Sequence, residues 1–315
     1  MFNALTIDVE DYFQVTAFKQ HVRREDWDRF PLRVVDNTAR ILDMLDECSI
    51  KATFFVLGWV AKRAPGMVRD IQARGHEIAC HGYGHQLIYD IGPDNFRADI
   101  RMARSILEDT CGTKINGYRA PSYSITKESL WALNILLEEG FIYDSSIFPV
   151  IHDIYGMPDA SRFPHAIKTS SGVIQEFPLS TVEIKVPGLT YRLPIAGGGY
   201  LRLFPVWLFK SGISRINVQE RQPAVLYFHP WEMDPGQPKI KAGGKSRFRH
   251  YINLHKTEAK VRSLFNSFKF VPMGQVLTQQ TRNGEPVNCA MKLMRSLTVG
   301  MTGYTQRRER SMIWS

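Results

Sequence analysis

Residues 4–11 read Ala-Leu-Thr-Ile-Asp-Val-Glu-Asp, a short apolar and β-prone run that ends in acids. This pattern predicts a buried strand with polar side chains directly after it. The same arrangement recurs along the chain, at residues 77–85, 115–121, 141–146 and 224–229. In parallel α/β folds the residues at the carboxyl ends of the strands line the site. The sequence therefore predicts one site built from residues that are far apart in the chain.

Helical patterns separate these strands in the first half of the chain. A further apolar strand is expected at residues 52–57, and apolar residues recur at helical spacing at 37–48, 65–74, 96–107 and 130–137. Strands that alternate with helices of about 10 to 15 residues imply parallel strands with right-handed crossovers. We therefore expect an α/β fold, either an open sheet or a barrel.

The pattern loosens between residues 150 and 220. Residues 197–199 are three glycines without the strand–helix context or the lysine of a phosphate loop, so we interpret them as a flexible turn. Residues 235–248 are interpreted as a Gly/Lys-rich loop. The remaining expected elements are a strand, two helices and a last strand, at 173–177, 203–214, 255–265 and 268–271.

The composition is that of an ordinary soluble globular protein, with 44% hydrophobic and 23% charged residues. A length of 315 residues fits one large domain or two smaller ones. The net charge of +9 mildly favours anionic surfaces or polymers. The basic residues are scattered and no RNA- or DNA-binding motif occurs, so we expect no nucleic acid partner.

Cysteine spacing and the chain ends bear on compartment. The four cysteines form no C-x-x-C pair, so we expect free thiols in the core rather than a cysteine zinc site. No signal peptide is evident, and no apolar stretch approaches the roughly 20 residues that span a bilayer. We expect a cytoplasmic protein. Residues 281–315 carry more basic than acidic residues and predict a weakly ordered basic tail, with a membrane-surface or subunit contact as the alternative.

A histidine pair is the first candidate for metal binding. His81 and His85 are four residues apart, and on a helical turn both rings could reach one ion. Gly82 and Gly84 argue against a regular helix and favour a tight loop that turns both rings inward. Such a pair also occurs by chance, but both histidines follow a predicted buried strand. Together with carboxylates, the pair suits a divalent metal of the zinc type.

Three acids follow the first strand, namely Asp8, Glu10 and Asp11. One would ligate the ion, and another would stay unligated as the base that deprotonates a water. Side chains alternate along a strand, so Asp8 and Glu10 point the same way if the strand continues. Asp11 would then point elsewhere, unless a bulge resets the phase. Helix capping or solvation is the structural alternative for each acid.

Residues at the ends of later strands supply further chemistry. Arg119 could pair with the base carboxylate and keep it ionised, with Pro121 fixing the turn, or it could be a surface arginine. Asp144 could act as a cap, pair with Arg119 or tune His229. His229 is placed to serve as general acid or to pack in the core.

Two aromatic residues near these motifs, Tyr123 and Trp231, could stack on sugar rings. Packing in the core is the structural alternative for both of them. Their positions beside the strand-end motifs make them, together with Pro121, candidates for substrate binding.

In this order, the motifs resemble those of the polysaccharide deacetylases with a NodB-homology domain, carbohydrate esterase family 4. The resemblance spans roughly residues 1–275, and its motifs lie at 6–11, 81–85, 119–121, 143–146 and 226–229. Residues 198–205 make the chain look most like the subgroup found with bacterial exopolysaccharide genes.

The resemblance implies a distorted (β/α) barrel with fewer than eight repeats, with seven the expected number. It implies a divalent metal, zinc first, with cobalt, nickel or manganese as alternatives. It also implies roles by position: Asp8 as the base, His81 and His85 as ligands, Arg119 as the residue that orients the base, Asp144 as the acid that tunes the last histidine, and His229 as the general acid.

Two departures from the family pattern matter. The common form has adjacent aspartates in the first motif, whereas Val9 separates Asp8 from Glu10 here. A related branch uses an Asp-x-Asp form, so Glu10 is the expected third ligand, with Asp11 as the alternative. Gly82 replaces the usual hydroxyl residue, which would remove a hydrogen bond that steadies the histidine loop.

We therefore expect a barrel at residues 1–280, with a subgroup-specific region at about 150–280, and a tail at 281–315. The expected activity is metal-dependent removal of N-acetyl groups from amino sugars of a polysaccharide or a lipid-linked saccharide. A hydrolase of another non-peptide C–N bond is the first alternative, and a non-catalytic glycan-binding module is the second. The expected partner is an acetylated glycan, with peripheral contact at the inner membrane surface through the basic tail. The sugar, its linkage and the oligomeric state do not follow from the sequence.

Overall fold

The structure, a computed structural model, describes residues 1–282. Residues 1–277 form one compact unit, and residues 278–315 are a second one. The predicted basic tail at 281–315 lies outside the described residues from position 283 onward.

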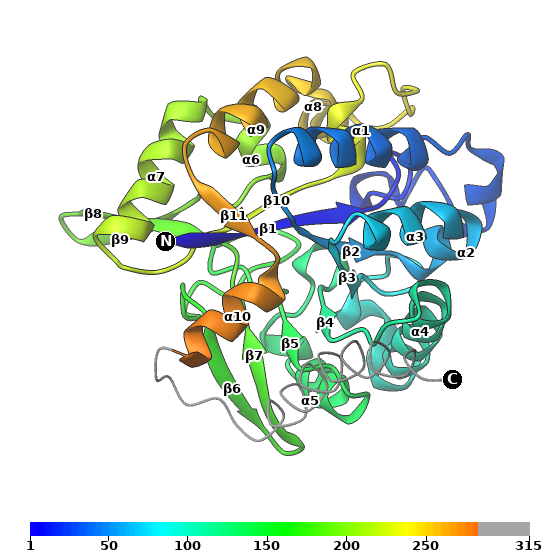
Figure 1. The fold of residues 1–315 in the computed structure, drawn as a ribbon, viewed down its shortest axis with the longest axis horizontal. Coiled ribbons are helices and arrows are strands. Elements are labelled where there is room, and N and C mark those ends of the chain that lie inside the picture. Colours follow the sequence, from blue (N-terminus) through cyan, green and yellow to red (C-terminus); the bar gives the residue numbers. More distant parts are fainter. Residues whose placement is uncertain (283–315) are drawn as a thin grey trace, which may run out of the picture. The chain divides into compact units, whose positions relative to one another are not determined.

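A nine-stranded sheet, almost entirely parallel, forms the centre of the first unit (Figure 1). From one edge to the other its strands are β10 (Val225–Phe228), β1 (Phe2–Val9), β2 (Thr53–Val56), β3 (Glu77–Cys80), β4 (Gly117–Tyr118), β5 (Tyr143–Asp144), β7 (Gly172–Glu176) and β6 (His165–Thr169). The strand β11 (Lys269–Val271) pairs with the first residues of β1. Only β6 runs antiparallel to its neighbour within this sheet of the described chain.

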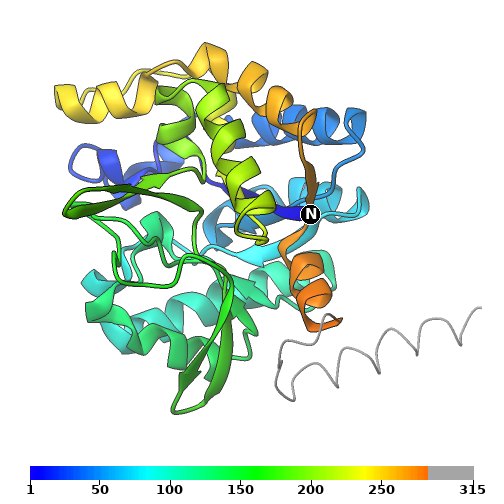
Figure 2. The same ribbon diagram turned by 90° about the vertical axis from the view of Figure 1, so that its left-hand side faces the viewer.

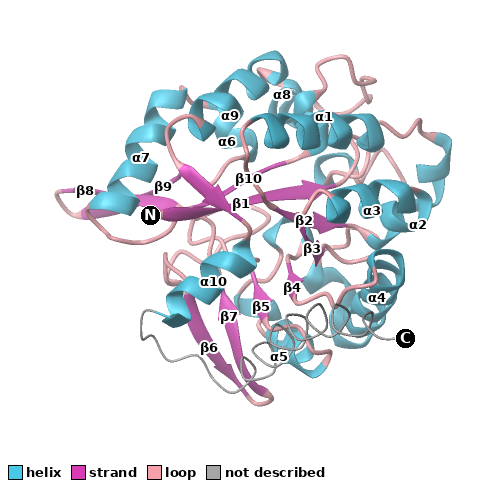
Figure 3. Cartoon of the chain, in the orientation of Figure 1, coloured by secondary structure: helices cyan, strands magenta, loops and turns pink. Residues whose placement is uncertain are grey.

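Helices cover the outside of this curved sheet, as the cyan elements around the magenta strands in Figure 3 show. They are α1 (Val34–Glu47), α2 (Gly58–Arg63), α3 (Pro65–Ala73), α4 (Ile88–Cys111), α5 (Trp131–Glu138), α6 (Gly198–Leu203), α7 (Val206–Val218), α8 (Gly244–Tyr251), α9 (Thr257–Phe265) and α10 (Met273–Arg282). The predicted fold class, an α/β barrel of parallel strands, is confirmed.

Apolar patterning explains why the first half of the chain follows the prediction. Every residue of β2 is buried, as expected for a parallel strand covered on both faces. In α4, the buried stripe includes Phe96, Ile100 and Leu107 at helical spacing. The helix ends at Gly112, whose φ of 65° gives the left-handed cap that glycine tolerates.

The second half differs from the prediction in three places. A hairpin of β8 (Thr181–Val186) and β9 (Leu189–Pro194) follows β7, and in Figure 2 this side of the molecule faces the viewer. The three glycines at 197–199 are not a flexible turn, because α6 starts there. A Cβ on Gly197 would lie 1.8 Å from the Tyr227 carbonyl oxygen, so close backbone packing against β10 requires glycine.

The Gly/Lys-rich segment at 235–248 is also more ordered than predicted. Its second half forms α8, which begins after Gly243. The pattern was missed because alternating basic residues on an exposed helix carry little apolar periodicity.

Two expectations concern the whole described chain. Cys48, Cys80 and Cys111 are free thiols. Among residues 1–282, no helix combines the length and the apolar character that crossing a bilayer requires.

Candidate active site

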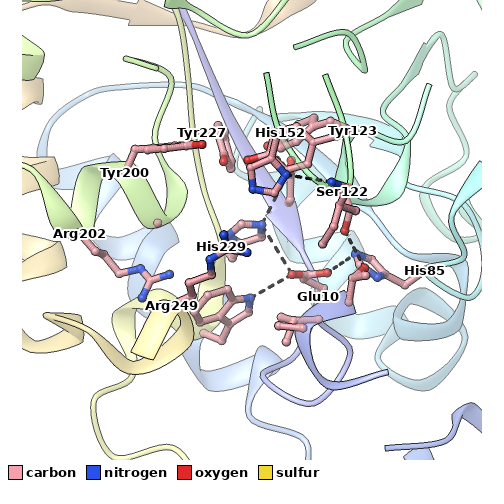
Figure 4. Close-up of a pocket in the computed structure, with 18 of the residues that line it drawn as sticks. Glu10, His85, Ser122, Tyr123, His152, Tyr200, Arg202, Tyr227, His229 and Arg249 are labelled. Atoms are coloured by element: carbon pink, nitrogen blue, oxygen red, sulfur yellow. Dashed lines mark hydrogen bonds and ion pairs between the residues drawn. The ribbon is translucent and has the colours of Figure 1, made fainter. Parts of the chain in front are cut away.

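A cavity of about 460 Å³ opens at the carboxyl ends of the strands (Figure 4). Its lining includes side chains that follow or end different strands: Asp8 and Glu10 from β1, His81 and His85 after β3, and His229 after β10. The barrel topology thus brings together polar residues that lie more than 200 positions apart in the chain.

Glu10, His81 and His85 form a group whose ligand atoms all lie within 4.8 Å of one another. The Nδ1 of His81 is 2.8 Å from the Arg119 carbonyl oxygen and donates to it, so Nε2 is the free nitrogen. The Nε2 of His85 lies 2.5 Å from Glu10 Oε2. All three side chains are therefore oriented toward a common point.

The burial and charge of Glu10 suit this group of three residues to a divalent ion. Glu10 is buried, and its Oε2 has no hydrogen-bond partner of suitable geometry in the described chain. Burying a carboxylate oxygen without a partner is costly, and a cation would remove that cost. Burial opposes ionisation of Glu10, but the neighbouring histidines outweigh it and keep the pKa of Glu10 below its ordinary value. A carboxylate with two imidazoles is a donor set typical of zinc.

A loop, rather than a helix, positions the histidine pair. Gly82 has a φ of +75°, and a Cβ there would lie 2.8 Å from Asp99 Oδ2. The same Asp99 oxygen accepts a hydrogen bond from the Tyr83 backbone nitrogen at 2.7 Å. Asp99 of α4 therefore steadies the loop, so the missing hydroxyl residue at position 82 leaves the loop anchored.

Asp11 lies away from the histidines and serves α1 instead. Its Oδ2 accepts hydrogen bonds from the backbone nitrogens of Arg33 (2.7 Å) and Val34 (2.9 Å) at the start of that helix. Its Oδ1 accepts a third bond from the Tyr12 nitrogen at 2.8 Å. Burial raises the pKa of Asp11 to about 6 despite these bonds. The geometry thus favours Glu10 over Asp11 as the third ligand.

Asp8 is held by a fully buried arginine. Nη1 of Arg119 donates to Asp8 Oδ1 at 2.7 Å and to Thr6 Oγ1 at 2.7 Å. The Tyr123 hydroxyl donates to the other oxygen, Asp8 Oδ2, at 3.3 Å. A charge-assisted bond of this kind orients the carboxylate.

The guanidinium of Arg119 has partners on each side. Its Nε and Nη2 donate to the carbonyl oxygen and the hydroxyl of Ser145, at 3.0 and 2.8 Å. Its carbon lies 4.2 Å above the ring of Phe55. Arg119 is therefore a core residue that connects β1, β2 and β5, not the surface arginine that the structural alternative envisaged.

His229 is paired with Glu232, and this corrects the sequence-based assignment. Its Nδ1 lies 3.1 Å from Glu232 Oε2, and its Nε2 faces the cavity. Asp144 was expected to tune His229, but its Oδ1 instead accepts a 2.6 Å bond from the Ser146 hydroxyl. The reason is that Asp144 lies in β5, whereas Glu232 follows His229 in the same turn.

Glu232 is in turn held by Arg202 of α6, whose Nε donates to Glu232 Oε1 at 2.6 Å. Burial alone would raise the pKa of Glu232, but Arg202 and His229 lower it to about 2. Burial alone would lower the pKa of His229, but its bond to Glu232 and the charge of Glu10 raise it to about 9. The pairing with Glu232 thus favours the imidazolium form of His229.

Asp144 and Glu176 are two buried acids that face each other as register partners on β5 and β7. Burial and the neighbouring Asp144 carboxylate raise the pKa of Glu176 well above its ordinary value. Glu176 therefore favours its protonated form beside Asp144.

Aromatic side chains make up much of the remaining lining, namely Tyr123, Tyr155, Tyr200, Tyr227, Trp231 and Phe248. Trp231 stacks on His250 at 4.1 Å between ring centroids, and its Nε1 donates to Glu10 Oε1 at 3.1 Å. Of the proposed substrate-binding residues, Tyr123 and Trp231 line the cavity. Pro121 does not, and it precedes two residues in the left-handed region, Ser122 and Tyr123.

Sequence reasoning missed Glu232 and Arg202. A signal for Glu232 existed, because it stands three residues after His229, and an acid there is typical of a capping box. Arg202 lies within residues 198–205, whose sequence was used only for the resemblance to the exopolysaccharide subgroup. Nothing in the local pattern connects it with a turn 30 residues later.

Family models match most of the chain. Residues 26–136 match the model described as polysaccharide deacetylase, and residues 145–278 match one described as a domain of unknown function (DUF3473). The chain carries a polysaccharide deacetylase domain. The first match contains His81, His85 and Arg119, and the second contains Arg202, His229 and Glu232.

Curated relatives resemble part of this deacetylase domain. A peptidoglycan-N-acetylglucosamine deacetylase of Bacillus cereus is 35% identical over 96 residues, which cover 30% of this chain and 35% of the relative. A chitooligosaccharide deacetylase of Azorhizobium caulinodans is 34% identical over 85 residues, which cover 27% and 40%. The alignments thus span less than half of either relative.

Solved structures share the fold over most of the chain. A Mycobacterium smegmatis protein assigned to the polysaccharide deacetylases has a TM-score of 0.59 at 21% identity, covering 91% of this chain and 92% of that one. A Pseudomonas aeruginosa protein with the same assignment has a TM-score of 0.57 at 14% identity, covering 90% and 92%. At such identities the likeness shows the fold.

Proposed function

We propose that this protein is a metal-dependent hydrolase that removes the N-acetyl group from an amino sugar of a polysaccharide or a lipid-linked saccharide. One observation carries the proposal. His229 Nε2 lies 4.0 Å from Asp8 Oδ2 and 3.6 Å from Glu10 Oε1, so a base and an acid flank the candidate ion site. The deacetylase activities named for the curated relatives support it.

Glu10, His81 and His85 would hold the ion. When bound, a divalent metal would polarise the acetamide carbonyl and make a water in the site more acidic. Zinc is our proposal, with cobalt, nickel and manganese as alternatives, because imidazole and carboxylate ligands are typical of catalytic zinc.

Asp8 is the proposed base. It takes a proton from the water whose oxygen attacks the acetyl carbon. Arg119 orients the Asp8 carboxylate, and the Tyr123 hydroxyl fixes its second oxygen. Because both oxygens are held, Asp8 presents its lone pairs in a defined direction.

His229 is the proposed acid. As an imidazolium it donates the Nε2 proton to the amine nitrogen while the C–N bond breaks, and acetate and a free amino sugar leave. Glu232 keeps this proton on His229 at neutral pH through the Nδ1 bond. The pair Asp8 and His229 therefore supplies the base and the acid of the proposed reaction.

The lining supports a sugar as the substrate. The ring of Tyr200, which lines the cavity and is partly exposed, suits the apolar face of a pyranose ring. We propose a glycan of the cell surface or an exopolysaccharide as its source, in line with the resemblance carried by residues 198–205.

Acetate release from N-acetylglucosamine oligomers tests the proposal, with metal first removed and then Zn²⁺ or Co²⁺ restored. We expect release that depends on metal and falls about 100-fold or more in Asp8→Asn, with zinc binding retained. Asp94→Asn, which removes an exposed charge from α4, is the control. Turnover of linear or cyclic amides without any glycan deacetylation would favour the alternative hydrolase, and unchanged activity in Asp8→Asn would contradict the mechanism.

A further inference from the structure

The segment Lys239–Tyr251 beside the cavity has an unusual charge. It reads Lys-Ile-Lys-Ala-Gly-Gly-Lys-Ser-Arg-Phe-Arg-His-Tyr and contains no acid. Lys239, Lys241 and Arg247 are exposed, and none of them forms an ion pair with a described residue. The segment is therefore strongly cationic, and the proposed chemistry does not use its charge.

Three side chains of α8 belong to the cavity itself, namely Lys245, Phe248 and Arg249. Lys245 and Arg249 are four residues apart, so they lie on one face of the helix, with Phe248 beside them. Phe248 is 59% exposed, which is high for an apolar side chain that nothing covers. This face combines two positive charges with an apolar contact at the entrance of the site.

Both cations converge on one carboxylate across the entrance. Asp153 Oδ2 lies 3.2 Å from Lys245 Nζ, and Asp153 Oδ1 lies 3.8 Å from Arg249 Nη1. His152, whose Nδ1 is 3.0 Å from the same Oδ1, stacks on Tyr155 inside the cavity. Asp153 itself is half exposed and does not line the cavity.

Such exposed pairs contribute little to stability, since water and salt screen them. An anion brought by a bound ligand could replace the Asp153 carboxylate at small cost, because the two cations are already placed for a charged group. The aromatic lining would hold the sugar, while the two cations would hold an acidic substituent next to it.

We propose that the glycan deacetylated here carries an anionic group close to its acetamido sugar, and that Lys245 and Arg249 bind this group in place of Asp153. The proposal rests on the proposed deacetylase function. The anion is a phosphate or a carboxylate, and it has two possible sources. One is the diphosphate of a lipid-linked sugar, and the other is a uronic acid within the polymer.

The test compares kcat/KM of the zinc-loaded protein for three substrates. They are N-acetylglucosamine tetramer as the neutral one, a hyaluronan tetrasaccharide as the uronate, and N-acetylglucosamine diphospho-farnesol as the diphosphate. We expect the wild type to prefer one of the anionic substrates over the neutral one. The one that is preferred identifies the source of the anion.

Variants assign the preference to α8. In Lys245→Gln/Arg249→Gln, the ratio of kcat/KM for the anionic substrate to that for the neutral one should fall about tenfold or more. The fall should come from a higher KM for the anionic substrate, with kcat unchanged. In Asp153→Asn the preference rises, because the cations lose their competing partner. The control Lys62→Gln/Arg69→Gln removes two exposed charges from α2 and α3, outside the cavity lining, and should leave the preference unchanged.

Four outcomes are decisive. Equal kcat/KM for all three substrates, or a preference that survives the α8 double variant, would overturn the inference and leave the deacetylase function standing. A preference that falls in Asp153→Asn would also overturn it. No acetate from any substrate would overturn both.

Discussion

At the scale of single residues, neighbouring acids of one motif have separate tasks. Glu10 faces His81 and His85, whereas Asp11 caps α1 through the nitrogens of Arg33 and Val34. The sequence left both acids open as ligands, because alternation along a strand does not specify where the strand ends. The structure separates them through the turn after β1, where the Glu10 nitrogen bonds the Asp8 carbonyl oxygen at 3.0 Å.

This separation predicts different losses in two matched variants. Glu10→Gln should weaken zinc binding about 100-fold or more, since a ligand is removed rather than an outer partner. Asp11→Asn should retain zinc and lower the free energy of unfolding by about 1 kcal/mol, since it weakens a helix cap. Zinc titration and urea unfolding measure the two effects, and loss of zinc in Asp11→Asn alone would reverse the assignment.

The partner of His229 gives a second prediction. Removing Glu232 alone would leave the buried Arg202 unpaired, which is strongly destabilising, so Arg202→Gln/Glu232→Gln is the informative variant. In it, burial should lower the pKa of His229 from about 9 to below its ordinary value.

We therefore expect kcat/KM of this double variant at pH 8 to fall about 10- to 100-fold, with zinc binding unchanged. Because the acid works in its protonated form, the alkaline limb of the pH–activity profile should move to lower pH. A profile that keeps its alkaline limb would show that Glu232 has a structural role only.

At the scale of elements, the regular strand–helix repeats were predictable and the irregular connections were not. The strand β3 begins and ends at the predicted residues, Glu77 and Cys80, because the apolar residues 78–80 stand between the polar Glu77 and His81. The hairpin of β8 and β9 has a half-exposed, mixed pattern, and α8 is basic throughout. Neither presents the apolar periodicity on which prediction depends.

The histidine loop is the element whose shape matters most for the site, and Gly82 tests it. An alanine at position 82 would adopt a φ of +75° and place its Cβ 2.8 Å from Asp99 Oδ2, which should distort the loop. Gly82→Ala should therefore weaken zinc binding and lower the free energy of unfolding by about 1 to 2 kcal/mol.

Gly66→Ala is the matched control, because Gly66 lies in α3 with nothing within 4 Å of a new Cβ. That substitution should leave zinc binding unchanged and raise the free energy of unfolding by about 0.5 to 1 kcal/mol. Differential scanning of both variants with and without zinc makes the comparison. Equal behaviour of the two would mean that the loop does not need glycine.

At the scale of the whole molecule, the barrel places the site over a buried network of charges. The site residues could be predicted one strand at a time, since each follows an apolar run. Their partners could not, because Arg202 bonds Glu232 from 30 residues away, and Asp144 lies opposite Glu176 on a neighbouring strand. Such contacts depend on register and crossover, which a single sequence does not show.

The acid pair Asp144 and Glu176 makes the stability of the molecule depend on pH. The pKa of Glu176 is raised above its ordinary value of 4.5, so the folded state binds a proton that the unfolded state has lost. The stability that this bound proton contributes to the folded state is complete below pH 4.5. It is lost as the pH rises toward the pKa that Glu176 has in the folded protein.

The glutamine in Glu176→Gln cannot ionise. The free energy of unfolding of this variant should therefore exceed that of the wild type by on the order of 1 kcal/mol at pH 8, and by little at pH 5. Urea unfolding at the two pH values measures this gain. An equal effect of the substitution at both would mean that Glu176 is ionised in the folded protein.

The central claim is that Glu10, His81 and His85 hold one ion that Asp8 and His229 use to remove an acetyl group. Zinc titration of the metal-free protein, with acetate release from an N-acetylglucosamine oligomer followed in parallel, tests it most directly. We predict that activity rises with zinc and saturates at one equivalent, and that Glu10→Gln abolishes both binding and release. Acetate release that is complete without metal, or that persists in Glu10→Gln, would contradict the account.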